Sequence, residues 1–321
     1  MHYFTDLLIK LNKNPLVFPA VALLWQRNWY KIFLLPNLGK QTPWKMKIAC
    51  LTISFDCDYP KDIQAFPKLI KIFTKYPFKT SFACVGKLIE QYPDEHKLIV
   101  EHGHEIINHT YSHPDNEIIN PYKKFNLLSR KEKIEEIIRC DEVCKKILDI
   151  SPIGFRAPHF KNLFSNDIYS ILRELRYIYC SSTLLTNTYS NGMPFFTSEG
   201  IIEFPLSTCP RHPLTVFDTW HSFNSPHLLY RLGHSKVREY IDLFKYLLEV
   251  ARRTHSYINI YIDPADLLKI KDFERLLDFI VSLPDDIEVL TYREIAKRIK
   301  GEQLNAKKEN SCCIGDEARS N

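Results

Sequence analysis

Two aspartates directly follow an apolar run near the start of the main part of the chain. Asp56 and Asp58 come after the β-branched stretch at residues 48–55, with only Cys57 between them. In an extended backbone, residues two apart point to the same side, so the two carboxylates converge on one point. Close like charges are costly unless a cation or a shared proton relieves the repulsion. The pair therefore indicates either a cation site or two turn or N-cap aspartates before the next helix.

Two histidines four residues apart form a second candidate. His109 and His113 follow the expected strand at residues 105–108. On one helical turn they lie on the same face, which suits binding a metal ion. Adding one of the aspartates gives two imidazoles and one carboxylate, a set that leaves the open position of a catalytic zinc site. Taken alone, the histidine pair is weak evidence, because histidine fills many structural roles.

An arginine stands at the end of a third expected strand. Arg156 follows residues 153–155 and precedes Ala157 and Pro158. The rigid proline and the planar guanidinium suit a fixed, forked ion pair with a carboxylate. Taken by itself, the residue is better explained as an exposed arginine in a loop.

Alternating strand and helix patterns place the three motifs. Strands are expected at residues 48–55, 80–85, 105–108, 153–155, 177–181, 201–204, 257–262 and 287–290. Helices are expected at residues 65–75, 93–101, 129–149, 166–175, 237–253 and 272–282, with a last one from residue 291. This alternation predicts an α/β fold with a parallel sheet, open or closed into a barrel. Sites in such folds form at the carboxyl ends of the strands, where all three motifs fall.

Composition restricts the classes of protein that remain. The chain has 321 residues, 45% hydrophobic and 25% charged, with 20 Phe and 17 Tyr, which excludes a wholly disordered chain. A net charge of +5, with dispersed basic residues, does not favour nucleic acid as a partner. Nine cysteines without paired CxxC motifs favour reduced thiols and a cytoplasmic location. Cys140 and Cys144 are interpreted as core or surface thiols on one helix face.

The two ends of the chain differ from its middle. The apolar run at residues 15–25 has eleven residues, whereas a spanning helix needs about 20. No small-residue cleavage site of a secretory signal follows it. Residues 1–47 are therefore predicted to be an extension that packs against the main domain. The alternative is contact with the cytoplasmic membrane face through Trp25, Trp29, Tyr30 and Phe33 with their neighbouring basic residues. Residues 300–321 are polar and aperiodic and are predicted to be disordered.

Together, the three motifs resemble those of the polysaccharide deacetylases, the family with the NodB-homology domain, also called carbohydrate esterase family 4. The segment from Asp56 to Asp58 is similar to the first family motif in its Asp-x-Asp form. His109-Thr110 through His113 is similar to the second motif. Arg156-Ala157-Pro158 is similar to the third, with His159 where the family usually has tyrosine. The resemblance covers about residues 48–299 and implies a distorted (β/α) barrel with mostly parallel strands.

The resemblance also implies roles for these residues. Asp58, His109 and His113 would bind a divalent metal, usually zinc, and Asp56 would be the general base that activates the attacking water. Arg156 would orient Asp56, and the backbone N–H of His159 would lie near the developing oxyanion. The implied protein is a hydrolase of carbon–nitrogen bonds other than peptide bonds. It would remove an N-acetyl group from a sugar, such as an N-acetylhexosamine in a glycan, a glycolipid or a precursor.

One position departs from the family pattern. The late strand at residues 257–262 is followed by Asp263, where the family usually has the histidine that protonates the leaving amine. Asp263 could serve as this acid only if burial or a nearby anion raised its pKa. His221, or less favourably His159 or His234, could replace it, or the enzyme could be slow or inactive.

Three further interpretations stay open. The protein could be an amidase that acts on a small or cyclic non-sugar amide. It could also be a non-catalytic sugar-binding or assembly protein on the same fold, which the departure at Asp263 favours. A group of basic residues could bind an anionic part of a substrate, although such charges usually just solvate a face. This group comprises Arg211, Arg231, Lys236 and Arg238. The oligomeric state is left open.

Overall fold

A computed structural model describes most of the main domain. The described residues are 48–160, 167–185, 188, 190, 192–211, 215–224, 236–270, 273–283 and 286–301. The predicted extension at residues 1–47 lies outside them, as do His234 and Arg231. Of the tail predicted to be disordered, residues 300 and 301 are described, and both continue the last helix, so the prediction is wrong for these two residues.

A mostly parallel sheet of nine strands forms the centre of the fold. The strand order is β6-β7-β5-β4-β3-β2-β1-β8, and β9 pairs with β1. Every pairing between strands is parallel except that of β6 with β7. The bounds are β1 (Ala49–Cys57), β2 (Ser81–Cys84), β3 (Glu105–Asn108), β4 (Gly154–Phe155), β5 (Tyr179–Cys180), β6 (Phe195–Phe196), β7 (Ile202–Glu203), β8 (Tyr257–Ile262) and β9 (Ile287–Val289).

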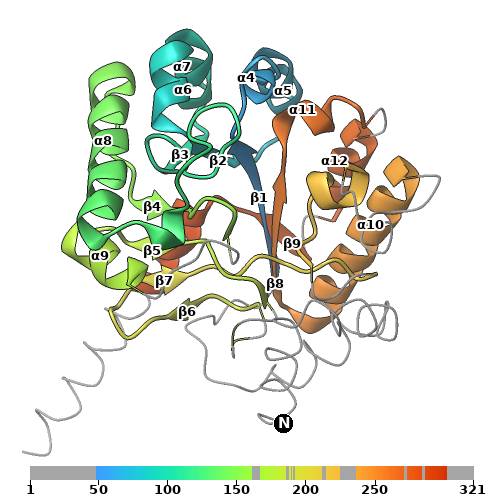
Figure 1. The fold of residues 1–321 in the computed structure, drawn as a ribbon. Helices are drawn as coiled ribbons and strands as arrows, with labels where there is room; N and C mark the ends of the chain where they lie inside the picture. Colours follow the sequence, from blue (N-terminus) through green and yellow to red (C-terminus); the bar gives the residue numbers. More distant parts are fainter. Residues whose placement is uncertain are drawn as a thin grey trace, which may run out of the picture.

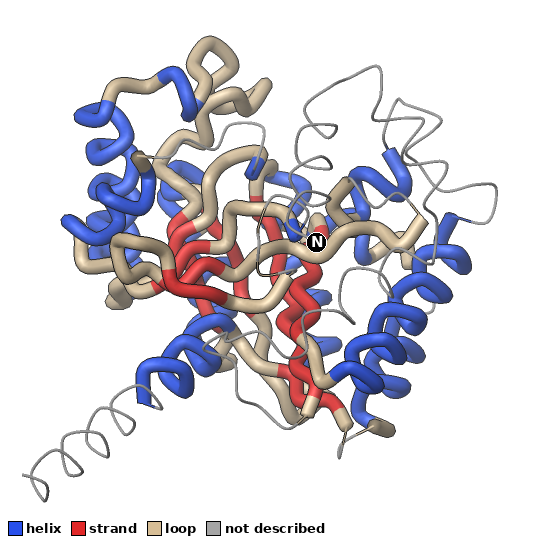
Figure 2. The backbone as a smooth tube through the Cα atoms, turned by 90° about the horizontal axis from the view of Figure 1, so that it is seen from below, coloured by secondary structure: helices blue, strands red, loops and turns tan. Residues whose placement is uncertain are grey.

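The sheet curls so that the segment after β7 meets β8. The backbone N–H of Ser207 donates to the carbonyl of Asn259 at 2.9 Å. In return, the N–H of Asn259 donates to the Ser207 hydroxyl at 3.0 Å. Because β8 stands at the far end of the strand order, these bonds bring the two sides of the sheet together. The predicted distorted (β/α) barrel with mostly parallel strands is confirmed (Figures 1 and 2).

Helices surround the strands, as Figure 2 shows from below. They are α4 (Pro60–Ile63), α5 (Phe66–Phe73), α6 (Gly86–Gln91), α7 (Pro93–Glu101), α8 (Arg130–Leu148), α9 (Ile168–Glu174), α10 (Lys236–Thr254), α11 (Pro264–Leu267) and α12 (Phe273–Val281). A 3-10 turn, η2 (Phe125–Leu127), a π-helical turn, η5 (Trp220–Asn224), and a helix over residues 292–301 complete the set. Two capping boxes, Ser129 with Glu132 and Thr291 with Glu294, begin α8 and the last helix.

Strand β1 shows why this sequence builds a polar barrel interior. All nine of its residues are buried. Leu51, Ile53 and Phe55 belong to the apolar core that includes residues of the surrounding helices. Thr52 and Ser54 alternate with them and donate to carbonyl groups of residues 290 and 260. The alternation of side chains along a strand therefore gives β1 one apolar face and one polar face.

Several details differ from the sequence-based expectations. Strand β1 continues to Cys57, so Asp56 lies within the strand. Helices α4 and α6 and strand β6 were not expected, because elements this short carry too few residues for a recognisable period. Seven cysteines are described, and all are buried free thiols. They are Cys50, Cys57, Cys84, Cys140, Cys144, Cys180 and Cys209.

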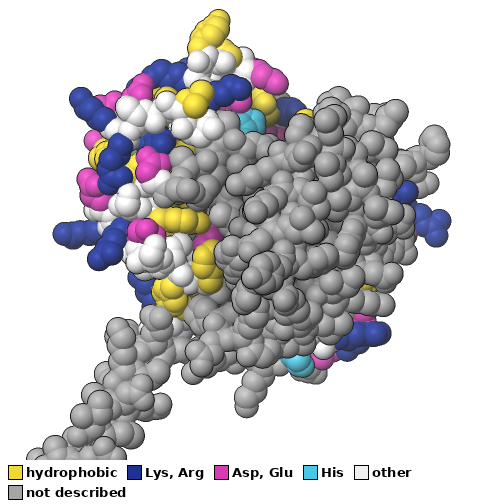
Figure 3. Space-filling view, turned by 60° about the horizontal axis from the view of Figure 1, so that its bottom comes forward, with side chains coloured by type: hydrophobic (Ala, Val, Ile, Leu, Met, Phe, Trp, Pro, Cys, Tyr) yellow, Lys and Arg dark blue, Asp and Glu magenta, His cyan; other side chains and the backbone are white. Residues whose placement is uncertain are grey.

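Charged side chains of both signs are interspersed over the described part of the face shown in Figure 3. Apolar side chains lie singly or in small groups between them on that view. Among the described residues, no helix has both the length and the apolar character needed to cross a bilayer.

Candidate metal centre and active site

Asp58, His109 and His113 come together at the carboxyl ends of β1 and β3. The Asp58 Oδ1 atom lies 3.2 Å from His109 Nε2 and 3.4 Å from His113 Nε2. One ligand atom from each residue lies within 4.8 Å of the others. These three atoms are buried and have no hydrogen-bond partner. Buried polar atoms are seldom left unsatisfied, and two imidazoles with a carboxylate are a ligand set for zinc, so the residues fit a divalent cation.

The charges within this cluster favour the ionised carboxylate. Burial alone would raise the pKa of Asp58, but His113 and His109 lower it well below its usual range. Burial lowers the pKa of His109, yet the adjacent Asp58 carboxylate raises it overall. The carboxylate is thus held in the form that binds metal ions.

The local backbone that positions the histidines differs from the expected helical turn. Residues 109–113 form a loop in which Thr110 and His113 have φ angles of 66° and 47°. The Asn108 side chain accepts a hydrogen bond from the Thr110 N–H at 2.8 Å, and the Thr110 hydroxyl accepts one from the His113 N–H at 3.0 Å. Left-handed residues other than glycine are uncommon and occur where other contacts hold them. The prediction of a helical turn is wrong because these side-chain bonds stabilise a different turn.

A backbone carbonyl orients the first histidine. His109 Nδ1 lies 2.8 Å from the carbonyl oxygen of Arg156, at the end of β4. With Nδ1–H donating to this carbonyl, Nε2 is the atom left facing Asp58. The second and third sequence motifs are therefore joined by one hydrogen bond.

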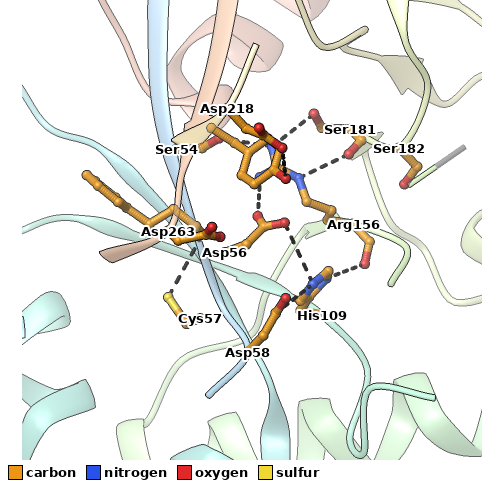
Figure 4. A network of polar contacts seen from close by, with 12 residues as sticks. Ser54, Asp56, Cys57, Asp58, His109, Arg156, Ser181, Ser182, Asp218 and Asp263 are labelled. Carbon is orange, nitrogen blue, oxygen red and sulfur yellow. Dashed lines mark hydrogen bonds and ion pairs between the residues drawn. The ribbon is translucent and has the colours of Figure 1, made fainter. Parts of the chain in front are cut away.

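Asp56 lies beside the cluster and is held by Arg156. The Arg156 Nη1 atom donates to Asp56 Oδ1 at 2.5 Å. The other oxygen, Oδ2, is 4.0 Å from His109 Nε2. Arg156 is fully buried, which excludes the alternative of an exposed loop arginine. Its remaining donors bond to polar groups of the barrel interior, drawn in part in Figure 4: the Ser54 and Ser181 hydroxyls, the Ser181 carbonyl and the Tyr292 hydroxyl.

Asp263 begins α11 at the level of Asp56. The register of β1 and β8 pairs Phe55 with Ile262, so the two aspartates are the next residues along neighbouring strands. Burial raises the pKa of Asp263 well above its usual value, and the nearby carboxylates of Asp62 and Asp218 raise it further. Asp263 therefore has the raised pKa that it needs in order to protonate a leaving amine.

The other histidines proposed as the acid are placed differently. His221 is buried on η5, and its backbone N–H donates to Asp218 Oδ1 at 2.6 Å. The His159 ring packs edge-on against His113 with centroids 5.0 Å apart, and its buried Nε2 has no hydrogen-bond partner. Burial, and then the charge of His113, lower the pKa of His159.

Two buried aspartates extend the acidic site beyond the predicted residues. Burial raises the pKa of Asp62 to about 7, aided by Asp58, and its carboxylate accepts from the N–H groups of Tyr59 and Ala265. Burial raises the pKa of Asp218 to about 7 as well, while Tyr261 donates a hydrogen bond to it. The sequence signal for Asp218 was its place three residues before the candidate His221, and Asp62 gave none.

The structure describes two of the four basic side chains suggested for anion binding. Arg211 forms an ion pair with Glu239, and Arg238 is exposed on α10. The side chain of Lys236 lies outside the described residues. Anion binding by this group stays a prediction.

Comparison with known proteins agrees with the geometry. Residues 45–180 match the family model for polysaccharide deacetylase. This part of the chain is therefore similar to the polysaccharide deacetylase family. The match includes all the residues of the metal cluster, Asp56 and Arg156.

Two curated relatives carry the name of a deacetylase. A peptidoglycan deacetylase of Helicobacter pylori is 28% identical over 151 residues, which cover 44% of this chain and 46% of the relative. A peptidoglycan-N-acetylglucosamine deacetylase of Bacillus cereus is 30% identical over 111 residues, which cover 35% and 36%. The chain thus spans less than half the length of these relatives.

Solved structures share the fold of this domain. A Mycobacterium smegmatis protein assigned as a polysaccharide deacetylase has a TM-score of 0.64 at 17% identity, covering 81% of this chain and 93% of that one. Puue allantoinase has a TM-score of 0.60 at 12% identity, with the same coverage. At these identities the likeness shows the NodB-type barrel.

Proposed function

We propose that the protein is a metal-dependent hydrolase that removes an N-acetyl group from a sugar. One observation carries the proposal: two unpartnered imidazole nitrogens and a carboxylate meet beside a second carboxylate that a buried arginine holds in place. Metal hydrolases that activate water need such an open ligand set with an adjacent base. The names of the curated relatives support a sugar as the substrate.

Asp58, His109 and His113 would hold the cation, and zinc suits this ligand set. A bound divalent cation lowers the pKa of water and polarises a carbonyl group. Asp56 accepts the proton of the attacking water at Oδ2, the oxygen that Arg156 Nη1 does not occupy. Arg156 holds and orients that carboxylate through a charge-assisted bond.

The leaving amine needs a proton, because an amide nitrogen leaves poorly without one. Asp263 supplies it in this proposal, since burial and neighbouring carboxylates raise its pKa and favour the protonated form. The backbone N–H of His159 donates to the oxyanion of the tetrahedral intermediate. From the cysteine pattern we also propose a cytoplasmic location and a substrate made inside the cell.

Release of acetate tests the proposal. Zinc-loaded protein is incubated with N-acetylglucosamine oligosaccharides and peptidoglycan fragments, and free acetate is measured against chelator-treated protein. We expect acetate release that chelation abolishes and that Asp56→Asn lowers by about 10²-fold or more, with metal content unchanged. Asp94→Asn on the exposed first turn of α7 serves as the matched control.

Three results would overturn the proposal. Acetate release that survives both chelation and Asp56→Asn would exclude the mechanism. Hydrolysis of cyclic amides without deacetylation of any sugar would identify the amidase alternative. Retention of metal and sugar without hydrolysis of any substrate would identify a binding protein.

A further inference from the structure

The second histidine of the metal cluster has a ring nitrogen to spare. His113 Nε2 faces Asp58 Oδ1 at 3.4 Å and belongs to the cluster. Its other ring nitrogen, Nδ1, is buried and has no hydrogen-bond partner within the described part of the chain. Histidines that bind metal ions almost always donate the second ring N–H to an acceptor, which fixes the tautomer and the ring orientation. His109 has such an acceptor in the Arg156 carbonyl, 2.8 Å from its Nδ1, and His113 needs one as well.

His159 offers an unpartnered nitrogen beside this ring. The side chain as a whole is partly exposed, yet its Nε2 atom is buried and has no partner among the described residues. The ring is therefore oriented with Nε2 towards the interior, and it packs against the His113 ring with centroids 5.0 Å apart and planes at 78°. Two imidazoles joined by an N–H···N bond of about 2.9 Å have centroids about 5 Å apart, whatever the twist between their planes. The observed separation matches such a bond.

The turn that carries His159 is held on both sides. The Ala157 N–H donates to the Ser182 hydroxyl at 2.8 Å. The Phe160 ring packs against Tyr261 with centroids 4.5 Å apart, and the Phe160 N–H donates to the Ala157 carbonyl at 3.2 Å. His159 and Phe160 both have left-handed φ angles, 51° and 44°. Such residues other than glycine are uncommon and persist where surrounding contacts hold them, so the fold itself places this imidazole.

His159 is placed as a neighbour of the metal cluster. The ligand atoms that lie within 4.8 Å of one another come from Asp58, His109 and His113. Three protein ligands leave a position open for water, as a catalytic zinc site requires, whereas a fourth would close it. A neutral imidazole has one nitrogen that donates and one that accepts. When His113 Nε2 is the ligand, its Nδ1 carries the proton, and the neutral His159 ring can accept it in a hydrogen bond at Nε2.

We propose that His159 is a positioning residue of the metal centre, whose Nε2 accepts a hydrogen bond from His113 Nδ1–H and so fixes the ring of that ligand. The inference rests on the metal cluster of the proposed function and gives a role to the His159 side chain. One bond would satisfy both buried nitrogens. Because His159 Nε2 is then engaged with His113, the role of acid towards a leaving amine falls to Asp263.

The affinity for Zn²⁺, measured by competition with a chelator on the full chain, tests this role without any substrate. We expect His159→Phe, which keeps a planar ring and removes the acceptor, to weaken Zn²⁺ binding about 10- to 100-fold. His159→Gln should recover most of the affinity, because its amide oxygen accepts hydrogen bonds. Rescue by glutamine separates the hydrogen bond from packing, since glutamine restores an acceptor and no ring.

His255→Phe is the matched control. His255 also has a left-handed backbone, with a φ angle of 48°, and it is exposed two residues before β8. The same substitution at these two positions meets similar backbone constraints, and His255→Phe should bind Zn²⁺ as the wild type does. Thermal unfolding checks that all variants fold.

Nitrogen NMR of histidine-labelled, zinc-loaded protein reads the hydrogen bond itself. We expect His113 Nδ1 to carry a slowly exchanging proton in the wild type and a rapidly exchanging one in His159→Phe. His159 Nε2 should be unprotonated and not bound to zinc.

Wild-type affinity in His159→Phe would overturn the proposal, as would a glutamine variant as weak as the phenylalanine variant, or His159 Nε2 bound directly to zinc. Absence of Zn²⁺ binding by the wild type would overturn it together with the metal centre. The expected zinc affinities without any release of acetate would instead refute the deacetylase function and leave the positioning role standing.

Discussion

Asp263 combines an unusual position with an environment that suits proton donation. It follows β8, at the place where the family pattern usually has a histidine, and its neighbours include other carboxylates. Burial and these like charges favour the protonated form of the carboxyl group. An aspartate can thereby hold the proton that an imidazolium would otherwise supply.

We expect Asp263→Asn to lower kcat by about 10²-fold or more without loss of metal, because asparagine cannot donate this proton. In the wild type, activity should fall as the pH rises through the raised pKa of Asp263, since the acid form is lost. Asp263→Asn should remove this limb of the kcat–pH profile, and Asp263→His should retain activity. Asp149→Asn, at an exposed left-handed position, is the control. Full activity of Asp263→Asn would assign the acid to another residue.

The last helix contributes to the site from a distance through its first residue. Tyr292 is buried in the barrel interior, where its hydroxyl accepts from Arg156 Nη2 and donates to Asn259 Oδ1, each at 2.5 Å. Asn259 on β8 also donates to the Ser181 hydroxyl and to the carbonyl of Phe204. The helix over residues 292–301 thus helps fix the guanidinium that holds Asp56.

Tyr292→Phe should destabilise the protein by about 1–3 kcal/mol, because it leaves Asn259 Oδ1 without this donor and Arg156 without one acceptor in a buried site. Urea unfolding monitored by circular dichroism measures the change. Tyr76→Phe removes a hydroxyl that bonds to α12 near the surface and should cost less. An equal or smaller loss for Tyr292→Phe would show that the interior network contributes little.

Buried carboxyl groups at one edge of the barrel make the stability of the whole molecule depend on pH. Asp62 and Asp218 both have a pKa raised to about 7, chiefly by burial. In the unfolded chain such groups release their protons near their ordinary pKa of about 3.9. The folded state therefore binds more protons between these values, and the free energy of unfolding falls as the pH rises towards 7.

Asp218→Asn should flatten this dependence, since asparagine carries no proton to lose. Urea unfolding of chelator-treated protein at pH 5 and at pH 8 gives the two free energies needed. We expect the difference between them to be smaller in the variant than in the wild type. A wild type that is more stable at pH 8 than at pH 5, with no change in the variant, would contradict the assignment.

The central strands and the meeting of the three motifs were predictable from the sequence because the causes are local. Strand β8 has the predicted bounds, since a short β-branched run between turn residues is a clear pattern. Asp58, His109 and His113 meet because parallel strands place their carboxyl ends at one edge. This rule does not depend on the conformation of the intervening loops.

Features that depend on distant contacts were not predictable. The turn at residues 109–113 is set by the Asn108 side chain, which no spacing rule anticipates. The roles of Tyr292 and Asn259 arise only when the last helix and β8 close around Arg156. Asp62 is close to the site because α4 and α11 pack together, as its bond to the N–H of Ala265 shows.

Calorimetric titration of chelator-treated protein with Zn²⁺ tests most directly whether these residues form a metal centre. We predict saturable binding of about one ion per chain. His113→Ala should abolish this binding, while His102→Ala, which changes a histidine at the end of α7, should leave it intact. Absence of saturable binding by the wild type, or unchanged binding by His113→Ala, would contradict the account.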